Sequence, residues 1–106
     1  MAIHPGDLTV IVPTRNEERN IGNFLGSIPE GIRLVVVDAS TDSTPDIVSR
    51  ARPHYTTLIR YPGTVTEARL AGADAANTPW LLFTDADVVF SEEYFSNIRK
   101  LEEYDL

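Results

Sequence analysis

The sequence predicts an α/β fold, a Rossmann-like parallel sheet of about four strands with helices on both faces. Apolar, β-branched runs of strand length alternate with stretches of helical period along the whole chain. The runs are almost continuously apolar, as in Leu34–Val37, which is typical of strands buried on both faces. No internal repeat, low-complexity tract or linker interrupts this alternation, so the 106 residues predict a single domain.

The composition excludes several classes of protein. The net charge of −7 and the pI near 4.6 argue against a nucleic-acid-binding surface, which would be basic. The same charge repels anions, so a phosphate site would need local donors or a metal ion. The absence of cysteine excludes disulfides, thiolate zinc sites and a thiol nucleophile. No apolar stretch reaches the ~20 residues that span a bilayer, and we expect a cytoplasmic protein.

The first strand is predicted over Leu8–Val12, ended by Pro13, which cannot donate to a sheet ladder. After a polar loop, Asn16 is a candidate N-cap for the first helix. One face of that helix repeats apolar residues at positions i, i+3, i+4 and i+7, namely Ile21, Phe24, Leu25 and Ile28.

The second strand is predicted from Ile32 to Val37 and runs into Asp38. A polar turn then leads to Thr44 and Pro45, a favourable N-cap and N1 pair for a second helix. The third strand, Tyr55–Tyr61, has a weaker pattern and is closed by proline and glycine.

The third helix is predicted to begin at Thr64 or Thr66 and to end near Asn77. A stripe of small residues on it allows close packing on the sheet: Ala68, Ala71, Gly72, Ala75 and Ala76. Trp80–Thr84 then reads as a central, buried strand with Trp80 in the core. A final helix, capped by Ser91, would turn inward the apolar residues Phe95, Ile98 and Leu101.

Acidic residues follow two of the predicted strands. Asp38 ends the second strand, and Asp85 and Asp87 follow the fourth. In the strand order 3-2-1-4 these ends meet the loop after Pro13 at the carboxyl edge, where open α/β sheets bind ligands. The chain has neither of the common glycine-rich phosphate loops. We therefore expect carboxylates and a divalent cation, Mg²⁺ or Mn²⁺, to hold any phosphate.

Four segments in this order resemble the inverting family 2 glycosyltransferases of the GT-A fold. The segments are Ile11–Glu18, Val35–Thr44, Glu67–Gly72 and Phe83–Asp87, and together they extend over nearly the whole chain. The resemblance implies a donor-binding domain that holds a UDP- or GDP-linked sugar for transfer to an acceptor that the sequence does not identify.

The resemblance also implies roles for individual residues. Thr14 and its neighbours would border the nucleobase, Asp38 would hydrogen-bond the base or ribose, and Arg69 would lie beside the nucleotide. Asp85 would face the ribose and the metal, and Asp87 would bind the metal that bridges the diphosphate. The full expected set is Pro13, Thr14, Arg15, Asn16, Glu17, Asp38, Arg69 and Asp85 for the nucleotide sugar, with Asp87 and Asp85 for the metal.

This chain departs from the family's pattern at three positions. The family often has Asp-Asp-Gly-Ser after the second strand, and here Val37 and Ala39 replace the first Asp and the Gly. Asp38 is then interpreted as the retained, nucleotide-facing acid. In the third segment Leu70 replaces an Asn.

The resemblance places the acceptor site and the general base in a C-terminal half beyond residues 1–106. No catalytic residue is therefore identified, and the Glu92 and Glu93 pair is interpreted as favourable charge at a helix N-terminus. We expect either a donor-binding fragment or a small protein completed by a partner or by self-association.

Two other functions compete with this interpretation. The first is a non-catalytic module that keeps the fold for nucleotide-sugar binding or assembly. The second is a receiver-like signalling domain, which would need a lysine after its last strand; the only lysine, Lys100, lies in the last predicted helix. Localisation would be cytoplasmic, or peripheral to the membrane through the acceptor.

Overall fold

A computed structural model describes residues 4–100, and the side chains of residues 4–97. A short 3-10 turn, η1 (Pro5–Asp7), precedes the sheet. The strands are β1 (Leu8–Thr14), β2 (Arg33–Asp38), β3 (Thr56–Arg60) and β4 (Trp80–Phe83). The helices are α1 (Ile21–Gly26), α2 (Thr44–Ala51), α3 (Val65–Ala75) and α4 (Tyr94–Lys100).

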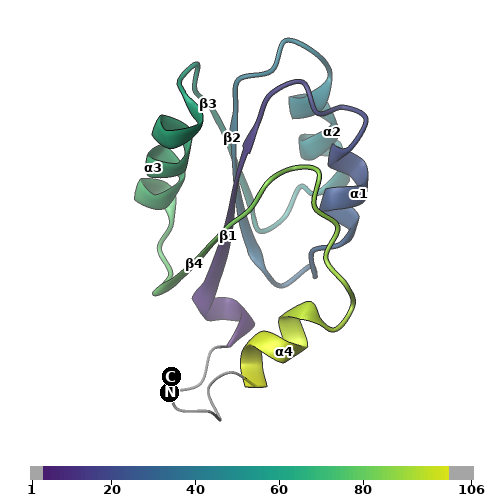
Figure 1. The fold of residues 1–106 in the computed structure, drawn as a ribbon, viewed down its shortest axis with the longest axis vertical. Helices are drawn as coiled ribbons and strands as arrows, with labels where there is room; N and C mark the ends of the chain where they lie inside the picture. Colours follow the sequence, from purple (N-terminus) through teal and green to yellow (C-terminus); the bar gives the residue numbers. More distant parts are fainter. Residues whose placement is uncertain (1–3, 101–106) are drawn as a thin grey trace.

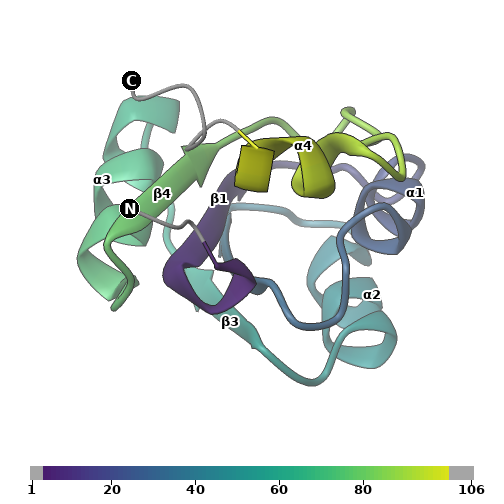
Figure 2. The ribbon, with the colours of Figure 1, turned by 90° about the horizontal axis from the view of Figure 1, so that it is seen from below.

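The four strands form one parallel sheet in the order β3-β2-β1-β4, which confirms the predicted fold class (Figure 1). Helix α3 covers one face of the sheet, and α1 and α2 cover the other (Figures 1 and 2). Helix α4 lies on the same side as α1 (Figure 2). All strand carboxyl ends therefore point to one edge, as parallel pairing requires.

The pleat of the strands divides the core into two clusters. Side chains alternate between the faces of a strand. Val12 and Val36 pack with α1, α2 and the aromatic rings near α4, whereas Ile11 and Val37 pack under α3. Position 37 therefore faces α3, and position 38 faces the opposite side.

Helix α3 lies very close to the sheet because its small stripe permits it, as predicted. A Cβ added at Gly72 would overlap Cγ2 of Ile11 and lie 3.3 Å from Cγ2 of Val37. We expect Gly72→Ala to lower the free energy of unfolding by about 1–3 kcal/mol, the usual cost of overpacking a core.

Urea denaturation would measure this loss, with Gly22→Ala as the matched control. Gly22 lies on α1, and a Cβ there would have no heavy atom within 4 Å. Alanine at Gly22 should be neutral or stabilising by up to about 1 kcal/mol, since glycine disfavours helix. Equal effects at the two sites would refute the close approach of α3.

The prediction that Pro13 ends the first strand is wrong. Strand β1 continues to Thr14, and Pro13 pairs with Val37 of β2. The oxygen of Ile11 accepts from Thr84 on the β4 side, so two residues later the missing N–H of Pro13 also faces that side. Because β4 has already ended there, the proline interrupts no ladder hydrogen bond.

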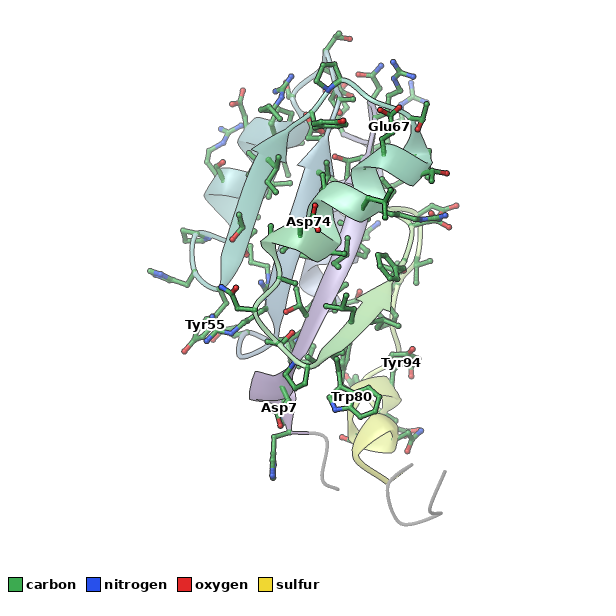
Figure 3. The ribbon with its side chains drawn as sticks, turned by 90° about the vertical axis from the view of Figure 1, so that its left-hand side faces the viewer. Asp7, Tyr55, Glu67, Asp74, Trp80 and Tyr94 are labelled. Carbon is green, nitrogen blue, oxygen red and sulfur yellow. The ribbon has the colours of Figure 1, made fainter. Side chains whose placement is uncertain are left out.

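The prediction that the fourth strand is central and buried is also wrong. Strand β4 is one of the two edge strands of the described sheet, and Trp80 is 43% exposed with its side chain on the outside (Figure 3). Leu81 and Phe83 are exposed as well. An apolar run reports hydrophobicity but not whether a neighbouring strand lies on each side, and this run has one neighbour, β1.

Three predicted helix caps shift. Helix α4 starts at Tyr94, three residues after the predicted cap Ser91, so Glu92 and Glu93 precede its first turn. Helix α1 starts at Ile21 with Asn20 as its N-cap, four residues after Asn16, because Asn16 adopts a left-handed backbone (φ 54°). Helix α2 begins at Thr44 itself, with Ser43 as the N-cap. Phe95 packs against the core as predicted. The predictions for Ile98 and Leu101 concern side chains outside the described part of the chain.

Among the helices of residues 4–100, none combines the length and the apolar character that crossing a lipid bilayer would require.

Candidate functional site

A cavity of about 350 Å³ lies at the carboxyl edge of the sheet, a size within the usual range for small-molecule sites. The loops after all four strands contribute to it. The predicted residues that line it are Pro13, Thr14, Arg15, Glu17, Asp85 and Asp87. The other lining residues are Val37, Ala39, Tyr61, Gly63, Thr64, Val65, Ala68 and Ala86.

The Asp85-Ala86-Asp87 segment places two exposed carboxylates at the cavity. Ala86, between the two acids, is buried in the core and anchors the segment there. The N–H of Thr84 donates to Ile11 (3.0 Å), and that of Val88 donates to the Asp85 carbonyl (3.2 Å). A short turn thus presents both carboxylates at the end of β4.

Arg69 reaches this acidic segment from α3. Its Nη2 lies 3.5 Å from Oδ1 of Asp85, a long contact between two partly exposed side chains that contributes little stability. Its Nε is buried and finds no hydrogen-bond partner among the described residues. Arg69 is not among the residues that line the cavity, but its guanidinium lies beside Asp85, which is, and its Nε donor is unsatisfied among the described residues.

The donor set at Asp85 and Asp87 fits Mg²⁺ or Mn²⁺. These ions prefer oxygen ligands, and Mg²⁺ is commonly held by one or two carboxylates together with phosphate oxygens and water. Within the described residues, no group of three or more His, Cys, Asp or Glu side chains forms a metal cage. Two carboxylates open to a cavity suit an ion that shares its ligands with a bound phosphate.

Asp38 is turned away from this cavity. Its side chain is fully buried, and it lies on the face of the sheet opposite α3. Thr14 Oγ1 (2.6 Å) and Ser40 Oγ (2.7 Å) donate to Oδ1, and the Ser40 N–H (3.0 Å) donates to Oδ2. Arg60 Nε lies 3.3 Å from Oδ2. The structure thus brings Val37, and not Asp38, to the cavity.

Asn16 also serves the architecture around the cavity. Its Oδ1 accepts from the N–H groups of Thr41 (2.8 Å) and Asp42 (3.2 Å), and its own N–H donates to Ser40 Oγ (2.7 Å). The Glu17 N–H donates to Thr44 Oγ1 (2.9 Å). These bonds tie the β1–α1 loop to the β2–α2 loop, which explains the left-handed backbone of Asn16 and leaves the neighbouring Arg15 at the cavity.

Sequence reasoning missed the wall formed by the β3–α3 loop, from Tyr61 to Val65. The available signal was the capping box of α3: the Glu67 N–H donates to Thr64 Oγ1 and the Thr64 N–H donates to Glu67 Oε1, both at 3.1 Å. A threonine three residues before a glutamate was visible in the sequence. The sequence did not show that this threonine caps α3 at the rim of the cavity.

The capping box makes the start of α3 sensitive to acid. The backbone N–H of Thr64, followed by its hydroxyl and that of Tyr61, lowers the pKa of Glu67 below its ordinary value of 4.5. A lowered folded-state pKa stabilises the protein above pH 4.5, and this contribution is lost as the pH falls through the lowered pKa.

We expect Glu67→Gln to reduce this acid-dependent loss. Urea denaturation of both proteins between pH 3 and pH 7 would measure it, and the difference between them should be largest at neutral pH and shrink toward pH 3. Curves separated by a constant amount at every pH would contradict the assignment.

Comparisons with known proteins agree on one family. The family model described as "Glycosyl transferase family 2" matches residues 9–103. A validoxylamine A glucosyltransferase of Streptomyces hygroscopicus subsp. limoneus is 32% identical over 86% of this chain and 22% of its own length. An uncharacterized glycosyltransferase of Mycobacterium tuberculosis is 38% identical over 76% of this chain and 36% of its own length.

A solved structure is similar in both fold and sequence. The crystal structure of Staphylococcus aureus TarS, residues 1–349, superposes with a TM-score of 0.83 and 28% identity, over 92% of this chain and 32% of that one. The chain thus spans about a fifth to a third of the lengths of these relatives.

Proposed function

The chain belongs to glycosyl transferase family 2, and on that premise we propose that its cavity binds a nucleotide-diphospho-sugar together with Mg²⁺ or Mn²⁺. In the whole protein this domain would supply the donor for inverting transfer of the sugar to an acceptor.

One observation carries the proposal: Asp85 and Asp87 line a cavity of about 350 Å³, and the Arg69 guanidinium lies 3.5 Å from Asp85. A chain with a net charge of −7 repels a free diphosphate. Two carboxylates at a phosphate site would add to that repulsion unless a cation lay between them and the phosphates. The acids and the arginine are together the donor set expected for a cation–diphosphate complex.

The chemistry assigned to these residues is binding and charge stabilisation. When bound, the cation supplies a Lewis acid beside the negative charge that develops on the leaving diphosphate. Asp87 and Asp85 would hold that ion, and Arg69 would donate to phosphate oxygens from the α3 side. Pro13, Thr14 and Arg15 would border the nucleoside, and Asp38 and Asn16 would hold the loops on which those residues lie.

Calorimetric titration with UDP and GDP, with and without Mn²⁺, tests the proposal. We expect binding that depends on the metal, and the same titration identifies the preferred nucleobase. Failure of both nucleotides to bind in Mn²⁺ would refute the proposal. Hydrolysis of a bound nucleotide sugar would indicate turnover by this domain, whereas binding without hydrolysis would indicate a donor-binding module.

A further inference from the structure

Tyr61 is the aromatic residue among the described residues that line the cavity, and it immediately follows β3. The acidic segment follows β4. Strands β3 and β4 are the two outer strands of the described sheet, three inter-strand spacings or about 14 Å apart. The aromatic ring and the carboxylates therefore enter one cavity from opposite edges of the sheet.

The Tyr61 ring is held in place from two directions. A Cβ added at Gly63 would overlap Cε1 of this ring and lie 2.9 Å from Cδ1, so the ring packs directly on the glycine backbone. The Tyr61 hydroxyl lies 3.5 Å from Oε2 of Glu67, a long contact to the capping box of α3. The Tyr61 N–H donates to the carbonyl of Asp38 (2.9 Å). The residue is still 37% exposed, so part of the ring is open to a ligand.

Part of the cavity lining is apolar or already hydrogen-bonded. Val37 and Ala68 contribute hydrocarbon to the cavity wall. The hydroxyl of Thr14 is used by Asp38, and that of Thr64 accepts from Glu67. A flat, uncharged group fits this part of the lining better than a phosphate or a sugar, whose polar atoms would lack side-chain partners on it.

We propose that the Tyr61 ring is the stacking platform for the nucleobase and that Gly63 is needed to seat it. This inference rests on the proposed function, because it assigns the base of the same nucleotide. The diphosphate then lies toward Asp85, and recognition of the base depends on stacking, which every base can provide.

Calorimetry in Mg²⁺ tests the inference with UDP, GDP and inorganic pyrophosphate, which lacks a base. Tyr61→Ala and Tyr61→Leu should weaken UDP and GDP about 5- to 150-fold, the range for loss of one base–aromatic stack. Both variants should bind pyrophosphate within about twofold of wild type, since the acidic segment is unchanged, and this binding also shows that they are folded.

Three further variants sharpen the test. Tyr61→Phe keeps the ring and should bind both nucleotides within about twofold of wild type. Gly63→Ala should weaken them as Tyr61→Leu does, because the added Cβ displaces the ring. Tyr55→Ala is the control, an exposed tyrosine at the opposite end of the sheet (Figure 3), and should leave binding unchanged.

The outcomes separate the two proposals. If wild type binds UDP and GDP and Tyr61→Ala and Tyr61→Leu bind them equally well, the stacking role is refuted and the proposed function stands. Equal loss of pyrophosphate and nucleotides in these variants also refutes stacking, since the ring would then only support the cavity. If wild type binds neither nucleotide, the proposed function and this inference fall together.

Discussion

Asp87→Ala should lower the Mn²⁺-dependent affinity for UDP and GDP by about 100-fold or more, because it removes one of the two protein carboxylates at the cation site. Changes in groups that only orient a metal ligand already cost about 10- to 100-fold in metal affinity. Loss of a ligand from a set of two should cost at least as much. Calorimetric titration in Mn²⁺ measures the effect.

The same variant should behave in the opposite way without metal. In a chelating buffer Asp87→Ala should bind the nucleotides no more weakly than wild type, since the missing carboxylate no longer repels the diphosphate. Asp74→Ala makes the same change in charge from an exposed position on α3 (Figure 3) and is the matched control. Indistinguishable metal dependence in Asp87→Ala and Asp74→Ala would remove Asp87 from the site.

Asp38→Ala should have the largest effect on stability, a loss of about 3–5 kcal/mol in the free energy of unfolding. The substitution leaves the Thr14 and Ser40 hydroxyls and the Ser40 N–H without their acceptor inside the protein. It also removes the fully buried carboxylate that pairs with Arg60, whose own side chain is 56% exposed. Urea denaturation measures the loss, and a change below about 1 kcal/mol would show that the buried network is dispensable.

Two comparisons show how Asp38 acts. Asp74→Ala, with no such partners among the described residues, should change stability by about 0.5 kcal/mol or less. Asp38→Asn keeps an acceptor oxygen and should lie between wild type and Asp38→Ala. The prediction that Asp38 contacts the nucleotide would be supported if Asp38→Asn, still folded and with the Tyr61 ring in place, bound the nucleotide more weakly than wild type. Unchanged affinity would leave Asp38 a purely structural role.

Much of the fold could be predicted from local patterns. The apolar runs gave the four strands, and the small stripe of α3 gave its close packing on the sheet. The errors arose where a residue's meaning depends on its neighbours. Pro13 is harmless inside β1 because its missing donor faces past the end of β4. Trp80 is exposed because β4 has a single neighbouring strand among the described residues.

The candidate site likewise contains features that the sequence predicted and features that it did not. The acidic residues after the fourth strand were predicted to lie close to the loop after Pro13. In the structure both segments line one cavity. Asn16 and Asp38 were assigned to the ligand with them, but their hydrogen bonds join the loops that shape the cavity. A hydrogen-bonding side chain in a motif can either bind the ligand or hold a loop in place, and the residue type alone does not distinguish these two roles.

The sequence by itself determined that parallel strands alternate with helices and that acids follow the strand ends, because hydrophobic period and chain order are local properties. Only the tertiary structure decided which face of each strand α3 covers. That choice turns Val37 toward the cavity and Asp38 into the core, since neighbouring residues of a strand point to opposite faces. It also brought Tyr61 and Asp87 to one cavity from the two outer strands, a proximity created only when the strands pair.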